Sequence, residues 1–173
     1  MKNKSTAIAL TFLSILLFIS IANAGTLVLN EGDKVEEFSL VNGLTKKKMS
    51  FHHDIMGKSK VTAIIFANTS CGACRKEIST LSSLSSQRPD FTTYAILVDM
   101  QGGEMIEEFH KRFNFNVTYL LDPDFTLPPT YGFYFTPSLI LVDKDGKIIF
   151  KKGGYDIKKD EKAISDKIDE LFK

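Results

Sequence analysis

The 173-residue sequence has no tryptophan, three histidines and only two cysteines, Cys71 and Cys74. A disulfide between cysteines this close in the chain would constrain little of the unfolded state. A chemical role is therefore favoured over a role in stabilising the fold. Basic and acidic residues nearly balance, at 22 and 21. The one short basic run, 46–48, fits a solvated strand edge. The composition therefore gives no basic stripe of the kind that binds nucleic acid.

Long hydrophobic runs are also missing, except at the start of the chain. Lys2 and Lys4 precede a largely apolar run of 15 residues, Ala7 to Ile21, which ends in the A-x-A pattern Ala22–Ala24. This pattern predicts a signal peptide over residues 1–24 and one exported domain over 25–173. The alternative is an uncleaved membrane anchor, although the run is shorter than the roughly 20 residues that span a bilayer.

The remaining chain alternates between strand and helix patterns. Segments 37–40 and 48–51 flank Asn42-Gly43, a turn signal that predicts a β-hairpin. A connector is expected at 54–60 and a loop with a short helical piece at 122–131. Further strands are expected at 61–67, 93–98, 117–121, 138–142 and 147–151, and helices from Cys71 to about Arg88, at 103–113 and at 157–172. This order predicts an α/β sandwich with helices on both faces of a central sheet.

The two cysteines lie where the buried strand 61–67 passes through a short loop into a helix. Cys71 is placed at the helix N-terminus, where free backbone N–H groups stabilise a thiolate. Cys74 lies one turn further and can attack a mixed disulfide formed on Cys71. Gly72 and Ala73 between them are small enough to leave Cys71 open to a partner. The context favours a redox motif.

Two other uses of the cysteine pair stay open. A structural zinc site needs four ligands, and the chain adds only His52, His53 and His110, without finger spacing. No metal is therefore expected, and His52 and His53 are interpreted as solvated loop residues. The second alternative is a purely structural bridge.

A second motif is Thr136-Pro137, directly before the apolar strand 138–142. A proline at the entry of a buried strand is unusual, and an X-Pro bond can adopt the cis form at small cost. The aromatic residues at 131 and 133–135 precede this motif. Part of this aromatic cluster is expected to pack in the core and part to border the site.

The runs FANTSCGACRKEISTL and YGFYFTPSLILVDKDGKIIFKKGG resemble the thioredoxin superfamily, and most closely its membrane-facing TlpA/ResA-like branch. The similarity extends from about Val35 to the end of the chain. It implies a thioredoxin-like three-layer α/β/α sandwich with a central mixed sheet, an N-terminal β-hairpin and an insertion in the core between Asp99 and Pro129.

The resemblance also implies roles for individual residues. Cys71 matches the solvent-facing nucleophile and Cys74 the buried resolving cysteine. Pro137 matches a cis-proline beside the disulfide, and the Thr136 backbone would pair with an extended substrate segment, with Gly72 and Ala73 also on the substrate side. Glu77 matches an acid that relays a proton to or from the resolving cysteine. The alternative interpretation is an exposed acid in the first helical turn, which the helix dipole favours.

The chain departs from the family pattern at four places. Ser70 replaces the tryptophan that commonly precedes the first cysteine, and the dipeptide between the cysteines is Gly-Ala rather than Gly-Pro. Ile65 occupies the place of a buried aspartate, and Phe135 that of a small residue. Redox potential and partner choice depend on the surroundings of the thiolate, so both are left open.

The function implied is a thiol:disulfide oxidoreductase that reduces disulfides in exported proteins, with cytochrome c maturation as one candidate process. It would need a membrane electron donor but no cofactor beyond the disulfide itself. One alternative is a peroxiredoxin-like peroxidase, although the P-x-x-x-T/S-x-x-C pattern has no proline here within 61–70. The other is a binding module on the same fold with a permanent bridge.

Overall fold

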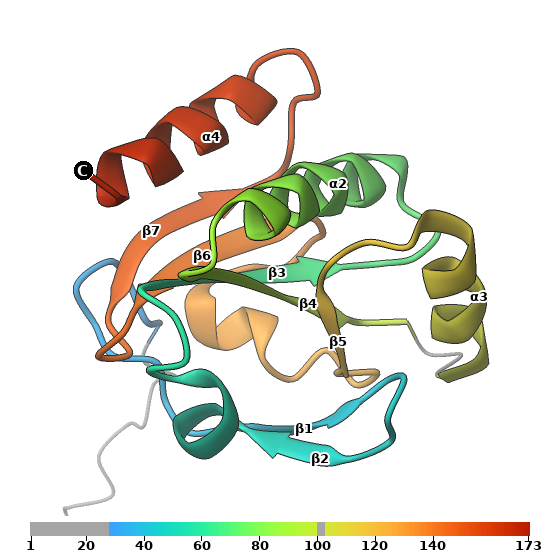
Figure 1. The fold of residues 1–173 in the computed structure, drawn as a ribbon. Helices are drawn as coiled ribbons and strands as arrows, with labels where there is room; N and C mark the ends of the chain where they lie inside the picture. Colours follow the sequence, from blue (N-terminus) through green and yellow to red (C-terminus); the bar gives the residue numbers. More distant parts are fainter. Residues whose placement is uncertain (1–27, 100–102) are drawn as a thin grey trace, which may run out of the picture.

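A seven-stranded sheet organises the computed structural model, which describes residues 28–99 and 103–173 (Figure 1). The strands are β1 (Ser39–Asn42), β2 (Lys48–Ser50), β3 (Val61–Ala67), β4 (Phe91–Leu97), β5 (Thr118–Leu121), β6 (Ser138–Asp143) and β7 (Ile148–Gly153). The α-helices are α2 (Gly72–Gln87), α3 (Gly103–Phe113) and α4 (Asp160–Leu171), and single helical turns occur at η1 (Phe51–Ile55) and η2 (Pro128–Tyr131). The predicted signal peptide, 1–24, lies outside the described residues. Within the described ranges, no helix is long and apolar enough to cross a membrane.

The strand order β2-β1-β5-β4-β3-β6-β7 makes the sheet mixed. Strands β5, β4 and β3 are parallel, whereas β6 runs antiparallel to β3, with Phe66 opposite Ser138. All seven residues of β3 are buried, as its continuous apolar sequence predicted for a strand covered on both faces. The α/β class with a central mixed sheet is confirmed.

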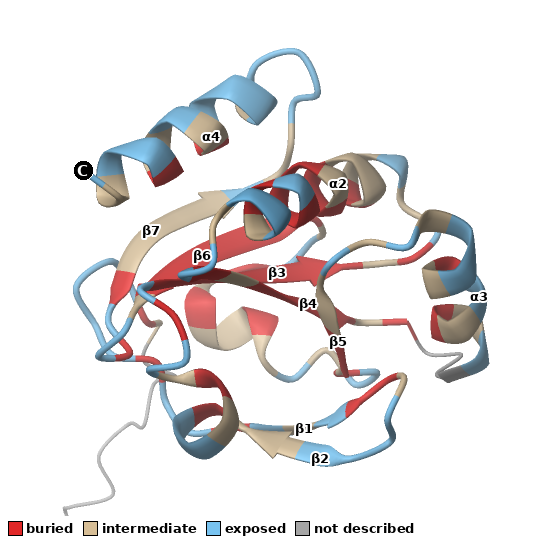
Figure 2. Cartoon of the chain, viewed as in Figure 1, coloured by how far each residue is buried: buried red, intermediate tan, exposed pale blue. Residues whose placement is uncertain are grey.

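The side chains of β3 point alternately to the two faces of the sheet, and the core is accordingly divided into two apolar clusters. Its odd-numbered residues, such as Ile65, join a cluster with α2, α3 and α4. Its even-numbered residues, such as Phe66, join a second cluster with η1, η2 and the segment 29–38. The regular helices thus share one cluster, and short turns cover the other face, below the sheet in Figure 1. Figure 2 shows the buried strands between these layers.

The N-terminal hairpin is present, and its turn begins at Asn42-Gly43, as predicted. Strand β1 continues to Asn42, and a five-residue loop leads to β2. The Asn42 side-chain oxygen accepts the N–H groups of Leu44 and Thr45 at 3.0 and 2.9 Å, which closes this longer loop. Gly43 is needed for a different reason, because a Cβ there would lie 2.8 Å from Ile106 on α3. The close packing of this loop against α3 therefore favours glycine at position 43.

The predicted insertion joins the hairpin to the rest of the sheet, because its strand β5 lies between β1 and β4. Strand β1 pairs antiparallel with β5, with Val41 opposite Leu121. Elements 61–67 and 103–113 have the predicted bounds. The final helix begins at Asp160 rather than at Ile157, because a turn at Asp156 precedes it, and the expected connector at 54–60 overlaps η1.

Candidate functional site

The cysteine pair forms a disulfide at the start of α2. The Cα atoms of Cys71 and Cys74 lie 5.2 Å apart. Cys71 is the N-cap residue of the helix, and its sulfur accepts the backbone N–H of Cys74 at 3.1 Å. Cys71 is half-buried, whereas Cys74 is fully buried. A thiolate on Cys71 would therefore face both a free helix N–H and the positive end of the helix dipole, which stabilise the anion.

The loop between β3 and α2 is held by its own polar side chains. The Asn68 side-chain oxygen accepts the backbone N–H of Ser70 at 2.9 Å, and the Asn68 carbonyl accepts the N–H of Cys71 at 3.2 Å. The loop therefore turns directly from the buried strand into the helix. This local turn chemistry places Cys71 at the cap position.

Two charged side chains hold the same loop from opposite sides. The buried carboxylate of Asp99 accepts the Thr69 backbone N–H at 3.0 and 3.1 Å and also accepts the Thr69 hydroxyl. The Arg75 guanidinium donates to the carbonyls of Thr69 and Ser70 at 3.3 and 3.1 Å. The N–H and C=O groups before Cys71 are thus both fixed. Sequence reasoning gave no role to Asp99, although an acid at the carboxyl end of a buried strand adjacent to β3 was a usable signal.

Replacing Asp99 with alanine is expected to destabilise the protein by about 1–3 kcal/mol, because the buried N–H and hydroxyl of Thr69 lose their acceptor. Urea unfolding of the oxidised protein measures this. Asp99→Asn keeps an acceptor oxygen and should recover much of the loss. Asp145→Ala, which removes an exposed carboxylate, is the control. Equal destabilisation by Asp99→Ala and Asp145→Ala would contradict the role assigned to Asp99.

Thr136-Pro137 lies at the same end of the sheet as the cysteine loop. The peptide bond between them is cis, Pro137 is buried and Thr136 is half-buried. Because Ser138 pairs with Phe66 near the end of β3, the residues before β6 adjoin the loop that follows β3. The Pro137 carbonyl accepts the N–H of Gly154 at 2.8 Å, which ties this segment to the end of β7.

The aromatic cluster before Thr136 is divided between core and surface. Tyr131 and Phe133 are buried in the second apolar cluster. Tyr134 and Phe135 are 73% and 55% exposed, so they present aromatic surface next to the cis-proline. Phe135 lies against the backbone of Gly153, where an added Cβ would come within 3.0 Å of its ring.

Glu77 lies on α2 one turn after Cys74 and is only 1% exposed. The interpretation of Glu77 as an exposed first-turn acid is therefore wrong, because α2 turns this position toward the core. Neither carboxylate oxygen has a hydrogen-bond partner in the described part of the chain. Burial raises the pKa of Glu77 to about 8, Lys152 opposes this shift and Asp160 adds to it. Residues three apart share a helix face, so this carboxyl lies on the same face of α2 as Cys74.

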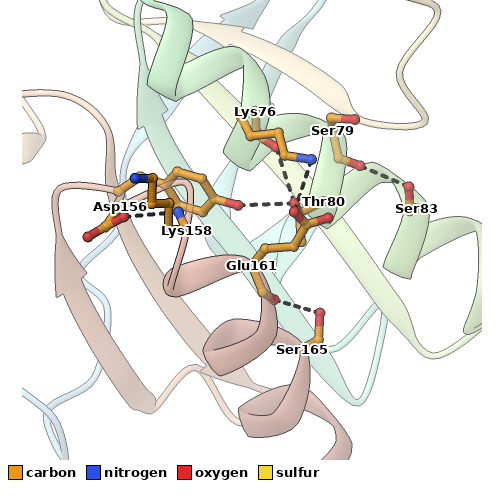
Figure 3. Close-up of polar contacts among 9 residues, drawn as sticks. Lys76, Ser79, Thr80, Ser83, Asp156, Lys158, Glu161 and Ser165 are labelled. Carbon is orange, nitrogen blue, oxygen red and sulfur yellow. Dashed lines mark hydrogen bonds and ion pairs between the residues drawn. The ribbon is translucent and has the colours of Figure 1, made fainter.

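Contacts between α2 and the C-terminal segment hold the helix next to Glu77. Lys76 and Glu161 form an ion pair at 3.0 Å, and Thr80 contacts the Tyr155 hydroxyl at 3.3 Å. Figure 3 shows these contacts between α2 and the C-terminal segment. They join α2 to α4 and to the segment that precedes α4.

The histidines take no part in this site. His52 and His53 lie in η1 and are exposed, and they contact Glu37 and Asp54 at 2.7 and 2.8 Å. His110 lies on α3 with its ring 5.9 Å from that of Tyr119. Across residues 28–99 and 103–173, no group of three or more His, Cys, Asp or Glu side chains could hold a metal ion.

A mixed sheet that carries a C-x-x-C disulfide at the start of a helix defines a thioredoxin-like fold. The model of the Redoxin family matches residues 30–168, and the chain belongs to this family. The expected likeness is thus confirmed at the level of this family and of the fold. Fold and disulfide together support a thiol:disulfide oxidoreductase.

Solved structures share the fold at low sequence identity. A protein assigned as thiol:disulfide interchange protein DsbE from Chlorobium tepidum is 22% identical, with a TM-score of 0.73 over 84% of this chain and 99% of that one. A protein assigned as a disulfide isomerase from Bacteroides thetaiotaomicron is 22% identical, with a TM-score of 0.68 over 83% and 91%. The thioredoxin domain of a thiol-disulfide oxidoreductase from Bacteroides vulgatus is 22% identical, with a TM-score of 0.62 over 80% and 97%. No curated protein sequence matches the chain significantly.

Proposed function

We propose that the protein reduces disulfide bonds in exported partner proteins. The observation that carries the proposal is the asymmetry of the disulfide, with Cys71 accessible at the helix N-terminus and Cys74 buried behind it. An accessible, low-pKa thiol attacks and a protected thiol resolves, which is the division of labour that disulfide exchange requires.

The exchange proceeds in two steps. The Cys71 thiolate attacks one sulfur of a partner disulfide, which forms a mixed disulfide and releases the other partner sulfur as a thiolate. Cys74 then loses its proton, attacks the Cys71 sulfur and releases the second partner thiol. Two electrons pass to the partner, and the Cys71–Cys74 disulfide remains.

Glu77 is the proton acceptor for Cys74 in this scheme. Burial raises the pKa of Glu77 to about 8, so its carboxylate is a stronger base than an ordinary one and is better suited to accept a proton from a thiol. The site contains no other hydrogen-bond partner for the Glu77 oxygens in the described chain. Glu77 is thus free to take the proton in one step and to return it when the protein is reduced again.

The partner segment lies across the exposed edge of the site. Thr136 offers backbone groups beside Pro137, and the exposed Gly72 and half-buried Ala73 leave room above Cys71. Electrons would come from a membrane donor, because an oxidising compartment holds no reductant pool. Export and service to cytochrome c maturation are part of this proposal.

The reduction potential of the Cys71–Cys74 pair tests the proposal. The protein is equilibrated in dithiol buffers of graded potential, and free thiols are counted by alkylation and mass. A reductase is expected to lie near the thioredoxin value of about −270 mV, whereas a value near about −120 mV would indicate an oxidant. A pair that stays oxidised far below about −300 mV would identify a permanent bridge in a binding module.

A further inference from the structure

A groove of about 300 Å³ lies between the cysteine loop and the inserted helix α3. Ser70 and Arg75 line it on the loop side, and Met105, Phe109, Arg112 and Phe113 line it on the α3 side. Ser70 is exposed and directly precedes Cys71. A chain joined to Cys71 through a disulfide therefore has this groove next to its point of attachment.

The floor of the groove is aromatic. The rings of Phe109 and Phe113 lie 4.9 Å apart, and Phe113 stacks on Phe115 at 5.4 Å. Phe109 is 6% exposed, so it anchors this group in the core. The floor offers a firm apolar surface for one side chain of a partner.

The walls of the groove carry an excess of positive charge. Arg75 uses its guanidinium on backbone carbonyls, and Arg112 lies 5.2 Å from the Phe113 ring. Neither arginine forms an ion pair with any acid in residues 28–99 or 103–173. Glu108 is the one acidic residue of the lining, against two arginines. A carboxylate entering the groove would therefore meet complementary charge.

We propose that this groove binds the segment of the partner protein that flanks its reactive cysteine, and that it selects segments that carry an acidic and an apolar side chain. The inference rests on the proposed reductase function and deepens it. The apolar side chain packs on Phe113 and Met105, which are both partly exposed, and the acidic one pairs with Arg112 and Arg75. The insertion that supplies α3 thereby acts as a specificity element beside the cysteine motif.

Three peptide disulfides that differ only next to the cysteine test this proposal, with glutamate, glutamine or lysine at that place. The purified protein is expected to reduce the glutamate peptide with a kcat/KM roughly fivefold above that of the lysine peptide at low salt, the size of about 1 kcal/mol of charge pairing. High salt should reduce this preference. Arg112→Glu should abolish or reverse it.

Lys111→Glu is the matched control, because it makes the same charge change on an exposed neighbour of Arg112 that does not line the groove. An equal effect of the two substitutions, or no preference in the unchanged protein, would overturn the proposal. Binding of the same peptides with serine in place of cysteine is measured separately. Tighter binding of the glutamate form supports the groove even if no peptide is reduced, and in that case only the reductase function fails.

Discussion

Replacing Cys74 with alanine is expected to turn the protein into a trap that holds its partners as stable mixed disulfides. Cys71 can still attack a partner disulfide, but no second thiol remains to release the product. Partner reduction should stop after one stoichiometric event, so catalytic turnover is lost altogether. Non-reducing electrophoresis and mass spectrometry of extracts treated with the variant measure the trapped species.

The matched control is the double variant Cys71→Ala with Cys74→Ala, which has no nucleophile. Adducts with Cys74→Ala that are absent with the double variant, and that a dithiol releases, would support the roles assigned from the asymmetric burial of the pair. Trapping by Cys71→Ala instead, with none by Cys74→Ala, would reverse the assignment. If neither Cys74→Ala nor Cys71→Ala formed adducts, this would count against disulfide exchange as the function.

Replacing Glu77 with glutamine is expected to remove a large pH dependence of stability. Between the ordinary pKa of 4.5 in the unfolded chain and about 8 in the folded protein, the folded state keeps a proton that the unfolded chain has released. The free energy of unfolding of the unchanged protein therefore falls as pH rises through this window. The slope reaches at most about 1.4 kcal/mol per pH unit, with an upper bound of about 5 kcal/mol in total.

Urea unfolding of the oxidised proteins at pH 5 and pH 8 measures this difference. Glutamine does not titrate. Any free-energy cost of burying it is therefore the same at both pH values and cancels in the difference between them. Glu104→Gln, which removes an exposed carboxylate at the start of α3, is the control. Parallel pH profiles for the unchanged protein and Glu77→Gln would contradict the raised pKa.

The same variant should slow resolution of the mixed disulfide, because Cys74 loses its proton acceptor. General acid–base catalysis of this kind is worth about 10²-fold or more. The lifetime of the mixed disulfide after rapid mixing gives the rate directly. A purely structural role for Glu77 would alter stability and leave this lifetime unchanged.

Features encoded in neighbouring residues could be predicted from the sequence. The apolar run of β3 and the amphipathic pattern of α3 gave the observed bounds, and the cysteine spacing placed Cys71 at a helix cap. Each depends on periodicity or capping within a few residues. The hairpin turn at Asn42-Gly43 was also signalled locally, whereas the close approach of Ile106 to Gly43 depends on a residue that is distant in the sequence.

The sequence by itself determined the α/β class, the thioredoxin-like order of elements and the cysteine motif at a helix start. Only the tertiary structure decided that Glu77 is buried, that Asp99 holds the loop before Cys71 and that α3 forms a groove beside it. The reason is physical. Strand and helix patterns follow from local backbone and solvent preferences, whereas the burial of a carboxyl or the partner of a loop N–H depends on which distant segments the sheet order brings together.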